Sequence, residues 1–249
     1  MRRLLNIVSL LNSGYKVSEL GALSDKKLFS LLVQQQENAD SKESQEFYVS
    51  QLIAAAMSYD EQHFDKIFSH CLLRFGFKDT YVQVIYPVLS RVGIMWASDT
   101  MPPAQEHFIS NIIRQKLFTV IDSLPPPAIT AETWVLFLPE NEFHEIGLLF
   151  AHYLVKSSGR KSIYLGANMP LDSLKNSIKE IKPDKLLFFL VRNNFPEENQ
   201  QLIDLVRSFS PIKTIYLVGN ENLIGSLKLG KIQWLQKVNE LEHVLFAGN

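Results

Sequence analysis

Apolar positions follow a helical period in the first half of the chain. Between residues 45 and 122, four stretches repeat apolar side chains at intervals of three and four, which predicts four amphipathic helices. Asp60 and Asp79 stand where N-caps are expected. Pro102 and Pro103 fit the first turn of the fourth helix, where a missing N–H costs nothing. A four-helix bundle is the natural arrangement of such segments.

The pattern changes between residues 133 and 249, where short apolar runs alternate with amphipathic segments. The runs are continuous, as is typical of strands covered on both faces: TWVLFLP, KSIYLG, DKLLFFLV, KTIYLVG and IQWLQ. Each intervening segment fits a crossover helix. This alternation predicts a doubly wound, five-stranded parallel sheet of flavodoxin type, whose ligands bind outside the carboxyl ends of the strands.

Two polar segments separate these parts. Residues 34–44 lack an apolar stripe, and residues 123–132 contain three consecutive prolines. They leave three expected regions, 1–33, 45–122 and 133–249. The first contains short helices, one of them with Ser24 as N-cap, and is too small to be stable alone. We therefore expect it either to pack on something else or to continue a part that is absent.

Composition narrows the classes of function. The 249 residues include 25 basic and 26 acidic side chains, so no overall field attracts nucleic acid or an anionic membrane. A single cysteine, Cys71, excludes a disulfide framework and fits a reducing cytoplasm. The apolar stretch at the N-terminus is too short to span a bilayer. The chain has no P-loop, G-x-S-x-G or G-x-G-x-x-G motif, and we expect no enzymatic activity.

The loop after the first expected strand, PENEFHEIG, contains the most informative motif. Glu142, His144 and Gly147 form E-x-H-x-x-G. This resembles the D-x-H-x-x-G signature of the cobalamin-binding family, whose histidine ligates cobalt from below. The resemblance implies cobalamin as the cofactor, His144 as the lower axial ligand of cobalt, and Glu142 as the carboxylate that holds the histidine.

The rest of that family's pattern is a serine-x-leucine and a Gly-Gly pair. At the matching spacing this chain has Phe189 and Val191, then Gly219 and Asn220. Where the family's serine bonds the buried nucleotide tail, Phe189 offers no partner and adds bulk. Asn220 places a side chain where glycine would let a ligand approach the backbone. These changes argue against a cobalamin whose tail is inserted into the protein.

A second motif, WASDTMPPAQEH, covers residues 96–107. Trp96 is followed by nine residues and then by Glu106 and His107. In one branch of these proteins a helical bundle with this spacing covers the upper face of the corrin. The resemblance implies that Trp96 shields the upper ligand, and that Glu106 and His107 offer polar groups to the upper face of the metal.

The stretch RRLLNIVSLLNSGYKVSELGALS is similar to the segment that closes the DNA-binding domain of MerR-type regulators. The chain thus resembles a MerR-family transcription regulator with a cobalamin sensor, with or without light as a signal, and with most of its DNA-binding domain absent. This implies double-stranded DNA as a partner, self-association into a dimer or larger oligomer, and no membrane partner.

Two alternatives remain open. In the first, the chain is a regulator whose pocket no longer binds cobalamin. In the second, the chain is a corrinoid-carrying subunit of a methyltransferase. Each site residue also has a structural explanation. His144 can bond Glu142 at a helix start, Trp96 can belong to the core, and Glu106 and His107 can be solvated residues of a first helical turn.

Overall fold

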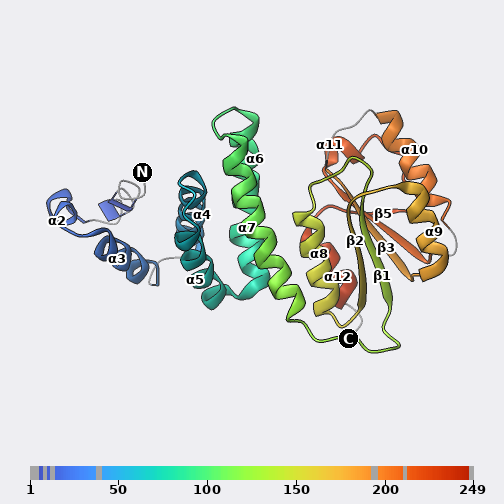
Figure 1. The fold of residues 1–249 in the computed structure, drawn as a ribbon, viewed down its shortest axis with the longest axis horizontal. Coiled ribbons are helices and arrows are strands. Elements are labelled where there is room, and N and C mark those ends of the chain that lie inside the picture. The colour runs from blue at the N-terminus through green and yellow to red at the C-terminus, as the bar shows by residue number, and fades with distance from the viewer. Residues whose placement is uncertain are drawn as a thin grey trace. The chain divides into compact units, whose positions relative to one another are not determined.

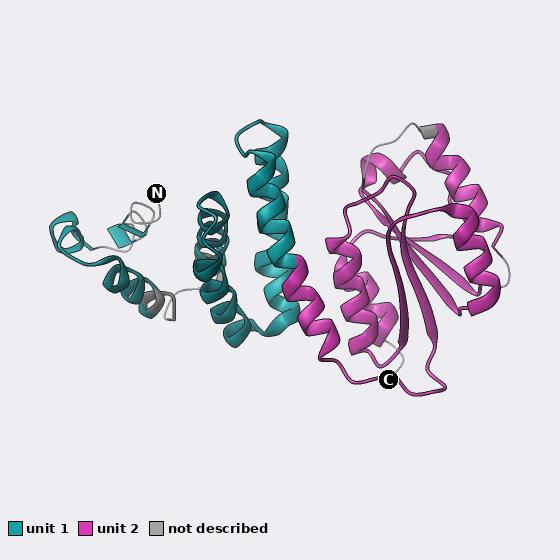
Figure 2. Ribbon diagram, viewed as in Figure 1, with its two compact units in different colours: residues 1–113 teal, residues 114–249 magenta. Residues whose placement is uncertain are grey.

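The chain divides into two compact units, residues 1–113 and residues 114–249 (Figure 2). The computed structural model describes residues 6–7, 10–11, 15–37, 41–191, 196–209 and 212–246. Parts of the stretch that resembles MerR-type proteins, residues 1–5, 8–9 and 12–14, lie outside the described residues.

The N-terminal unit is helical (Figure 1). Its elements are α2 (Val17–Gly21), α3 (Asp25–Glu37), α4 (Ser41–Met57), α5 (Glu61–Thr80), the π-helical turn η1 (Tyr81–Ile85), α6 (Tyr86–Ala97) and the start of α7 (Pro103–Asp122). Two predicted caps are confirmed. Asp60 accepts a hydrogen bond from the backbone N–H of His63 at 2.9 Å, and Ser24 accepts one from Lys27 at 3.3 Å.

One sequence expectation for this unit was wrong. Asp79 lies inside the helical run rather than at its start. The reason is Gly76, whose φ of 72° turns the chain, so that the helix resumes before Asp79 is reached. In the polar segment 34–44, α3 continues to Glu37 and α4 begins at Ser41.

The first helices pack on the bundle, as expected of a segment too small to fold alone. Buried hydrogen bonds join them. The side-chain amide of Gln51 on α4 donates to Asn6 at 3.0 Å, and Oε1 of Gln51 lies 2.9 Å from Nε2 of His63. The ring of Phe29 meets the imidazole of His63 edge-on. Fully partnered polar groups of this kind fix the register of a helix contact.

The C-terminal unit is a doubly wound α/β domain. Its strands are β1 (Thr133–Pro139), β2 (Lys161–Met169), β3 (Lys185–Leu190), β4 (Thr214–Gly219) and β5 (Gln233–Leu235). All are parallel in the order β2-β1-β3-β4-β5, which confirms the five-stranded flavodoxin-type sheet within the described residues. The edge strand β2 is half-buried, so the expectation that every run is covered on both faces was wrong there.

Helices cover both faces of this sheet (Figure 1). They are α8 (Ile146–Ser157), α9 (Leu171–Ile181), α10 (Pro196–Arg207), α11 (Glu221–Ile224) and α12 (Val238–Phe246). Helices α9, α10 and α11 share one apolar core with the sheet. Helix α8 contacts β1, β2 and α12. The segment that forms α12 was not predicted as a helix.

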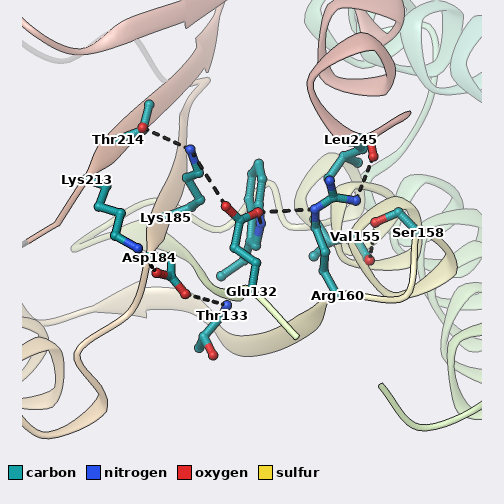
Figure 3. Close-up of polar contacts among 11 residues, drawn as sticks. Glu132, Thr133, Val155, Ser158, Arg160, Asp184, Lys185, Lys213, Thr214 and Leu245 are labelled. Carbon is teal, nitrogen blue, oxygen red and sulfur yellow. Dashed lines mark hydrogen bonds and ion pairs between the residues drawn. The ribbon is translucent and has the colours of Figure 1, made fainter. Parts of the chain in front are cut away.

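Charged side chains hold together the amino ends of the strands (Figure 3). Glu132 accepts hydrogen bonds from the indole of Trp134 at 2.8 Å and from Arg160 at 3.1 Å. Asp184 accepts from Lys213 at 2.6 Å and from the backbone of Thr133, and these two bonds hold the pKa of that carboxyl below its ordinary value. This network fixes one end of the sheet and leaves the carboxyl ends for a site.

Candidate functional site

The candidate site lies where the strand order changes direction. From β1 the chain proceeds first to β2 on one side and then to β3 on the other. The loops that leave β1 and β3 therefore diverge, and such a divergence is the usual ligand site of a doubly wound sheet. Glu142 and His144 belong to the first of these loops, and Val191 directly follows β3.

Glu142 is the organising residue of this loop. It is 3% exposed, and both of its carboxylate oxygens are partnered. Oε1 accepts hydrogen bonds from the backbone N–H of Phe143 at 2.9 Å and of His144 at 3.1 Å. Oε2 accepts one from the backbone N–H of Val191 at 3.1 Å. Because Val191 follows β3, this single carboxylate ties the β1 loop to the neighbouring strand.

The ring of His144 is held by the same carboxylate. Its Nδ1 lies 2.5 Å from Oε1 of Glu142, while its side chain is 64% exposed. With the proton on Nδ1, the ring donates to the carboxylate, and Nε2 becomes the nitrogen that can ligate a metal. A carboxylate behind the ring also raises the basicity of that nitrogen. The contact made in the family by aspartate is thus made here by the longer glutamate.

Two asparagines shape the loop around Glu142. Asn141 and Asn168 both have positive φ, 65° and 55°. The backbone N–H of Asn141 donates to Oδ1 of Asn168 at 2.8 Å, and the backbone N–H of Asn168 donates to the carbonyl of Glu142 at 3.0 Å. Sequence reasoning missed this clasp. Asparagine after a strand is a usable signal, because it adopts the left-handed region more readily than other residues with a side chain.

A second charged group stands beside the histidine. Glu145 forms an ion pair with Arg114 of α7 at 2.6 Å and accepts a hydrogen bond from the hydroxyl of Tyr164 at 3.0 Å. Burial, together with the charge of Glu145, raises the pKa of the Tyr164 phenol, so the phenol stays protonated and acts as a donor. These three residues were not singled out from the sequence, and no local motif marks them.

Phe189 occupies the position of the family's serine, and its ring packs against Gly147. A Cβ placed on Gly147 would lie 3.0 Å from Cε2 and 3.4 Å from Cδ2 of that ring. Phe189 is 9% exposed. The glycine of the E-x-H-x-x-G motif therefore makes room for a phenyl group in this structure.

The Gly219–Asn220 pair stands next to Phe189, at the end of β4. Leu190 and Gly219 are register partners, and a Cβ on Gly219 would lie 2.7 Å from the carbonyl oxygen of Leu190 and 2.9 Å from the side chain of Ile224. Oδ1 of Asn220 accepts a hydrogen bond from the backbone N–H of Leu223 at 2.9 Å. Asn220 is thus the N-cap of α11, which is a structural role.

Trp96, Glu106 and His107 lie in the N-terminal unit. Trp96 is 54% exposed near the end of α6, so it is not a core residue. Glu106 accepts a hydrogen bond from the hydroxyl of Ser110 at 2.5 Å, and its other oxygen lies 3.2 Å from Nδ1 of His107. The side chain of His107 is 75% exposed. The structure thus brings Glu106 and His107 together and leaves the indole of Trp96 largely open to solvent.

A bare metal ion finds no ready-made site in the part of the chain that is described. No group of three or more His, Cys, Asp or Glu side chains among those residues could hold one. The same described residues include no helix with the length and apolar character needed to cross a membrane.

Comparison with known proteins assigns the helical part. Residues 48–120 match the family model described as the B12 binding domain. The chain is 26% identical over 172 residues to the HTH-type transcriptional repressor CarH of Myxococcus xanthus, covering 69% of this chain and 57% of that protein. It is 30% identical over 160 residues to the repressor CarA of the same organism, covering 63% of this chain and 53% of the relative.

The chain thus spans little more than half the length of these two repressors. Among solved structures, the monomethylamine corrinoid protein of Methanosarcina barkeri superposes with a TM-score of 0.63 at 13% identity, over 81% of this chain and 98% of that one. This likeness shows the fold: a helical part followed by a doubly wound parallel-sheet domain. Residues 48–120 are therefore similar to the B12 binding domain, and the chain is similar in sequence to two HTH-type transcriptional repressors.

Proposed function

We propose that this chain is the sensor region of a DNA-binding transcription regulator, and that the ligand it senses is a corrinoid of the cobalamin type. The observation that carries the proposal is the pairing of Glu142 with His144 at the carboxyl end of β1. A buried carboxylate fixes the ring, and the ring itself is accessible. The sequence relation to two repressors supports the regulatory role.

The lower half of the site supplies one axial ligand. When bound, a corrinoid would supply a cobalt centre that accepts a nitrogen ligand. In this proposal His144 would hold it through Nε2, and Glu142 would keep the proton on Nδ1. Glu142 also accepts a hydrogen bond from the backbone N–H of Val191. Ligand binding at His144 would therefore affect the loops that follow both β1 and β3.

A second group of residues that we assign to ligand binding belongs to the N-terminal unit. We assign Trp96 as the group that excludes water from the upper ligand, and Glu106 and His107 as polar groups facing it. The exposure of Trp96 and His107 supports this assignment, because both side chains have surface to give to a ligand. Ser110 and His107 together orient the carboxylate of Glu106.

A regulatory role implies two partners, double-stranded DNA and a second copy of the chain. It also implies that the protein acts in the cytoplasm and catalyses no reaction. A change of upper ligand, caused chemically or by light, would alter self-association and with it operator binding. In this proposal the described residues near the N-terminus, of which Asn6 bonds Gln51 of the bundle, would transmit the signal to the DNA-binding part.

The test uses the full-length natural protein and DNA. Duplexes selected from a random pool are expected to bind specifically, and added corrinoid is expected to change the dissociation constant by about tenfold or more. The variant His144→Ala should bind the same duplexes without responding to corrinoid. Absence of specific DNA binding, together with methyl transfer between the bound corrinoid and an acceptor, would instead identify a methyltransferase subunit.

A further inference from the structure

The two halves of the C-terminal site point to different ligands. The axial half fits a corrinoid, since Glu142 holds His144 with one ring nitrogen directed to ligation. The half that would accept a nucleotide tail does not fit one. At the position where a tail-binding protein of this fold places a small hydroxyl, this chain places the phenyl ring of Phe189.

The ring fills space rather than lining it. Phe189 is buried, and its edge touches the backbone of Gly147 so closely that a single added carbon would crowd it. Gly147 belongs to the first turn of α8, and Phe189 is in β3. The gap between that strand and that helix, next to His144, is therefore closed by side-chain packing.

The opposite face of the sheet is closed at the same level. Leu190 and Ile224 are buried, and a Cβ added to Gly219 would lie 2.9 Å from the side chain of Ile224. Oδ1 of Asn220 is committed to capping α11. Phe189, Leu190 and Ile224 offer no polar side-chain atom to a buried nucleotide base, so inserting one beside them would cost both volume and hydrogen bonds.

Because this space is filled, it limits the kinds of corrinoid that His144 can ligate. Cobalamin carries its own nucleotide base, which binds the lower face of cobalt in the free molecule. For His144 to replace it, the base must leave, and its tail then needs a place. A corrinoid without the tail has no such cost, because its lower face is occupied only by exchangeable water.

We propose that this site selects corrinoids that lack a nucleotide tail, the cobinamide class, over cobalamin, and that Phe189 sets this preference. The proposal rests on the corrinoid-sensing function proposed above. The quantity that tests it is the ratio of the dissociation constants of cobalamin and cobinamide for the same protein. This ratio separates recognition of the tail from corrinoid binding in general.

The experiment titrates the whole chain in the dark with aquocobinamide and, separately, with hydroxocobalamin, following the corrin absorption bands. The wild type is expected to bind cobinamide at least about tenfold more tightly, which corresponds to about 1.4 kcal/mol. Phe189→Ser should tighten cobalamin binding by about tenfold and leave cobinamide binding unchanged. His144→Ala should lose the spectral change with cobinamide.

A matched control separates the channel from general loosening of the core. Phe209 is a phenylalanine of similar burial in the same unit, located after α10 and before β4, at the other end of the sheet. Phe209→Ser should leave the ratio as in the wild type, and circular dichroism of both variants shows whether the fold is kept. Phe189→Ala repeats the test if the serine variant does not fold.

The outcomes distinguish the two proposals. Equal affinity for both corrinoids, tighter binding of cobalamin, or an unchanged ratio in Phe189→Ser would overturn the selection of tail-less corrinoids while leaving a corrinoid sensor in place. Binding of neither corrinoid by the wild type would refute the corrinoid sensor itself, and the selectivity with it.

Discussion

Motif spacing in the sequence identified both the loop around His144 and the segment from Trp96 to His107. The two regions differ in how many hydrogen bonds hold their side chains and in where those bonds come from. Four donors converge on the buried carboxylate of Glu142, and they come from two separate strand ends. Glu106 contacts His107 and Ser110, all within two turns of one helix. The first region is organised before any ligand arrives, whereas the second offers exposed side chains that a ligand would have to order.

Motif spacing therefore does not indicate whether the surrounding structure holds a residue in place before a ligand binds. A residue pair held by long-range hydrogen bonds contributes to folding stability, so its removal is felt without ligand. Exposed residues on one helix contribute little to stability, so their importance appears only in binding.

Removal of the Glu142 side chain should damage the unliganded protein most. Glu142→Ala leaves the buried N–H groups of Phe143, His144 and Val191 without their acceptor, and we expect a loss of about 3 kcal/mol in the free energy of unfolding of the C-terminal unit. Urea denaturation in a Trp96→Phe background reports this, because the other two tryptophans, Trp134 and Trp234, both lie in that unit.

The matched control for that variant is Glu140→Ala. Glu140 is an exposed acidic residue of the same loop. Its removal should change the unfolding free energy by less than about 0.5 kcal/mol. Similar losses for the two variants would show that Glu142 does not organise the loop.

The contact between Gly147 and Phe189 should appear as a coupling energy. In the wild type, Gly147→Ala forces the ring to move, and overpacking of this kind costs about 1–2 kcal/mol. In a Phe189→Ser background the same substitution should cost less than about 0.5 kcal/mol, because the space is then open. Equal costs in both backgrounds would mean that the ring does not fill this gap.

A half-buried histidine next to β2 should make the same unit sensitive to acid. Burial, and then the charge of Lys156, lower the pKa of His152 to about 4, and its Nδ1 lies 2.7 Å from the hydroxyl of Ser162. In the unfolded chain its pKa is about 6.5. The unfolded state therefore binds the extra proton first, so stability present above about pH 6.5 is lost as the pH falls toward 4.

We expect this to contribute about 1–2 kcal/mol, with allowance for solvent screening at a partly exposed ring. His152→Gln should flatten the dependence of unfolding free energy on pH between 6.5 and 4. His107→Gln, which changes an exposed imidazole, should leave that dependence as in the wild type. A slope unaffected by His152→Gln would refute the assignment.

The smallest effect is expected in the Trp96–His107 segment. His107→Ala and Trp96→Phe should each change the unfolding free energy of the unliganded protein by less than about 0.5 kcal/mol, because both side chains are largely exposed. Both should weaken corrinoid binding in the absorbance titration. Strong destabilisation with unchanged binding would make these residues structural.

Much of the fold was predictable because its signals are local. Continuous apolar runs identified the strands, and Asp60 and Ser24 marked helix starts that their side chains do cap. The missed features depend on context. The end helix α12 follows a strand of only three residues, so the pattern there was too short to interpret. Gly76 shifted a helix start away from Asp79 through a backbone conformation that composition does not specify.

The candidate site was predictable only in part, for the same reason. The E-x-H-x-x-G spacing identified Glu142 and His144, but not that the backbone of Val191 would bond the same carboxylate across the gap between strands. The clasp between Asn141 and Asn168 joins residues 27 apart. The substitution of serine by Phe189 was visible in the sequence, whereas the contact of its ring with Gly147 required the packed structure.

The most direct test of the account is the absorbance spectrum of the protein after incubation in the dark with aquocobinamide or hydroxocobalamin, followed by desalting. The account predicts that the wild type keeps a corrin spectrum from at least the first of these. The spectrum should be lost in His144→Ala and kept in His243→Ala, which changes an exposed histidine of α12 in the same unit. A colourless wild type, or a corrin spectrum that survives in His144→Ala, would contradict the assignment of His144 as the axial ligand.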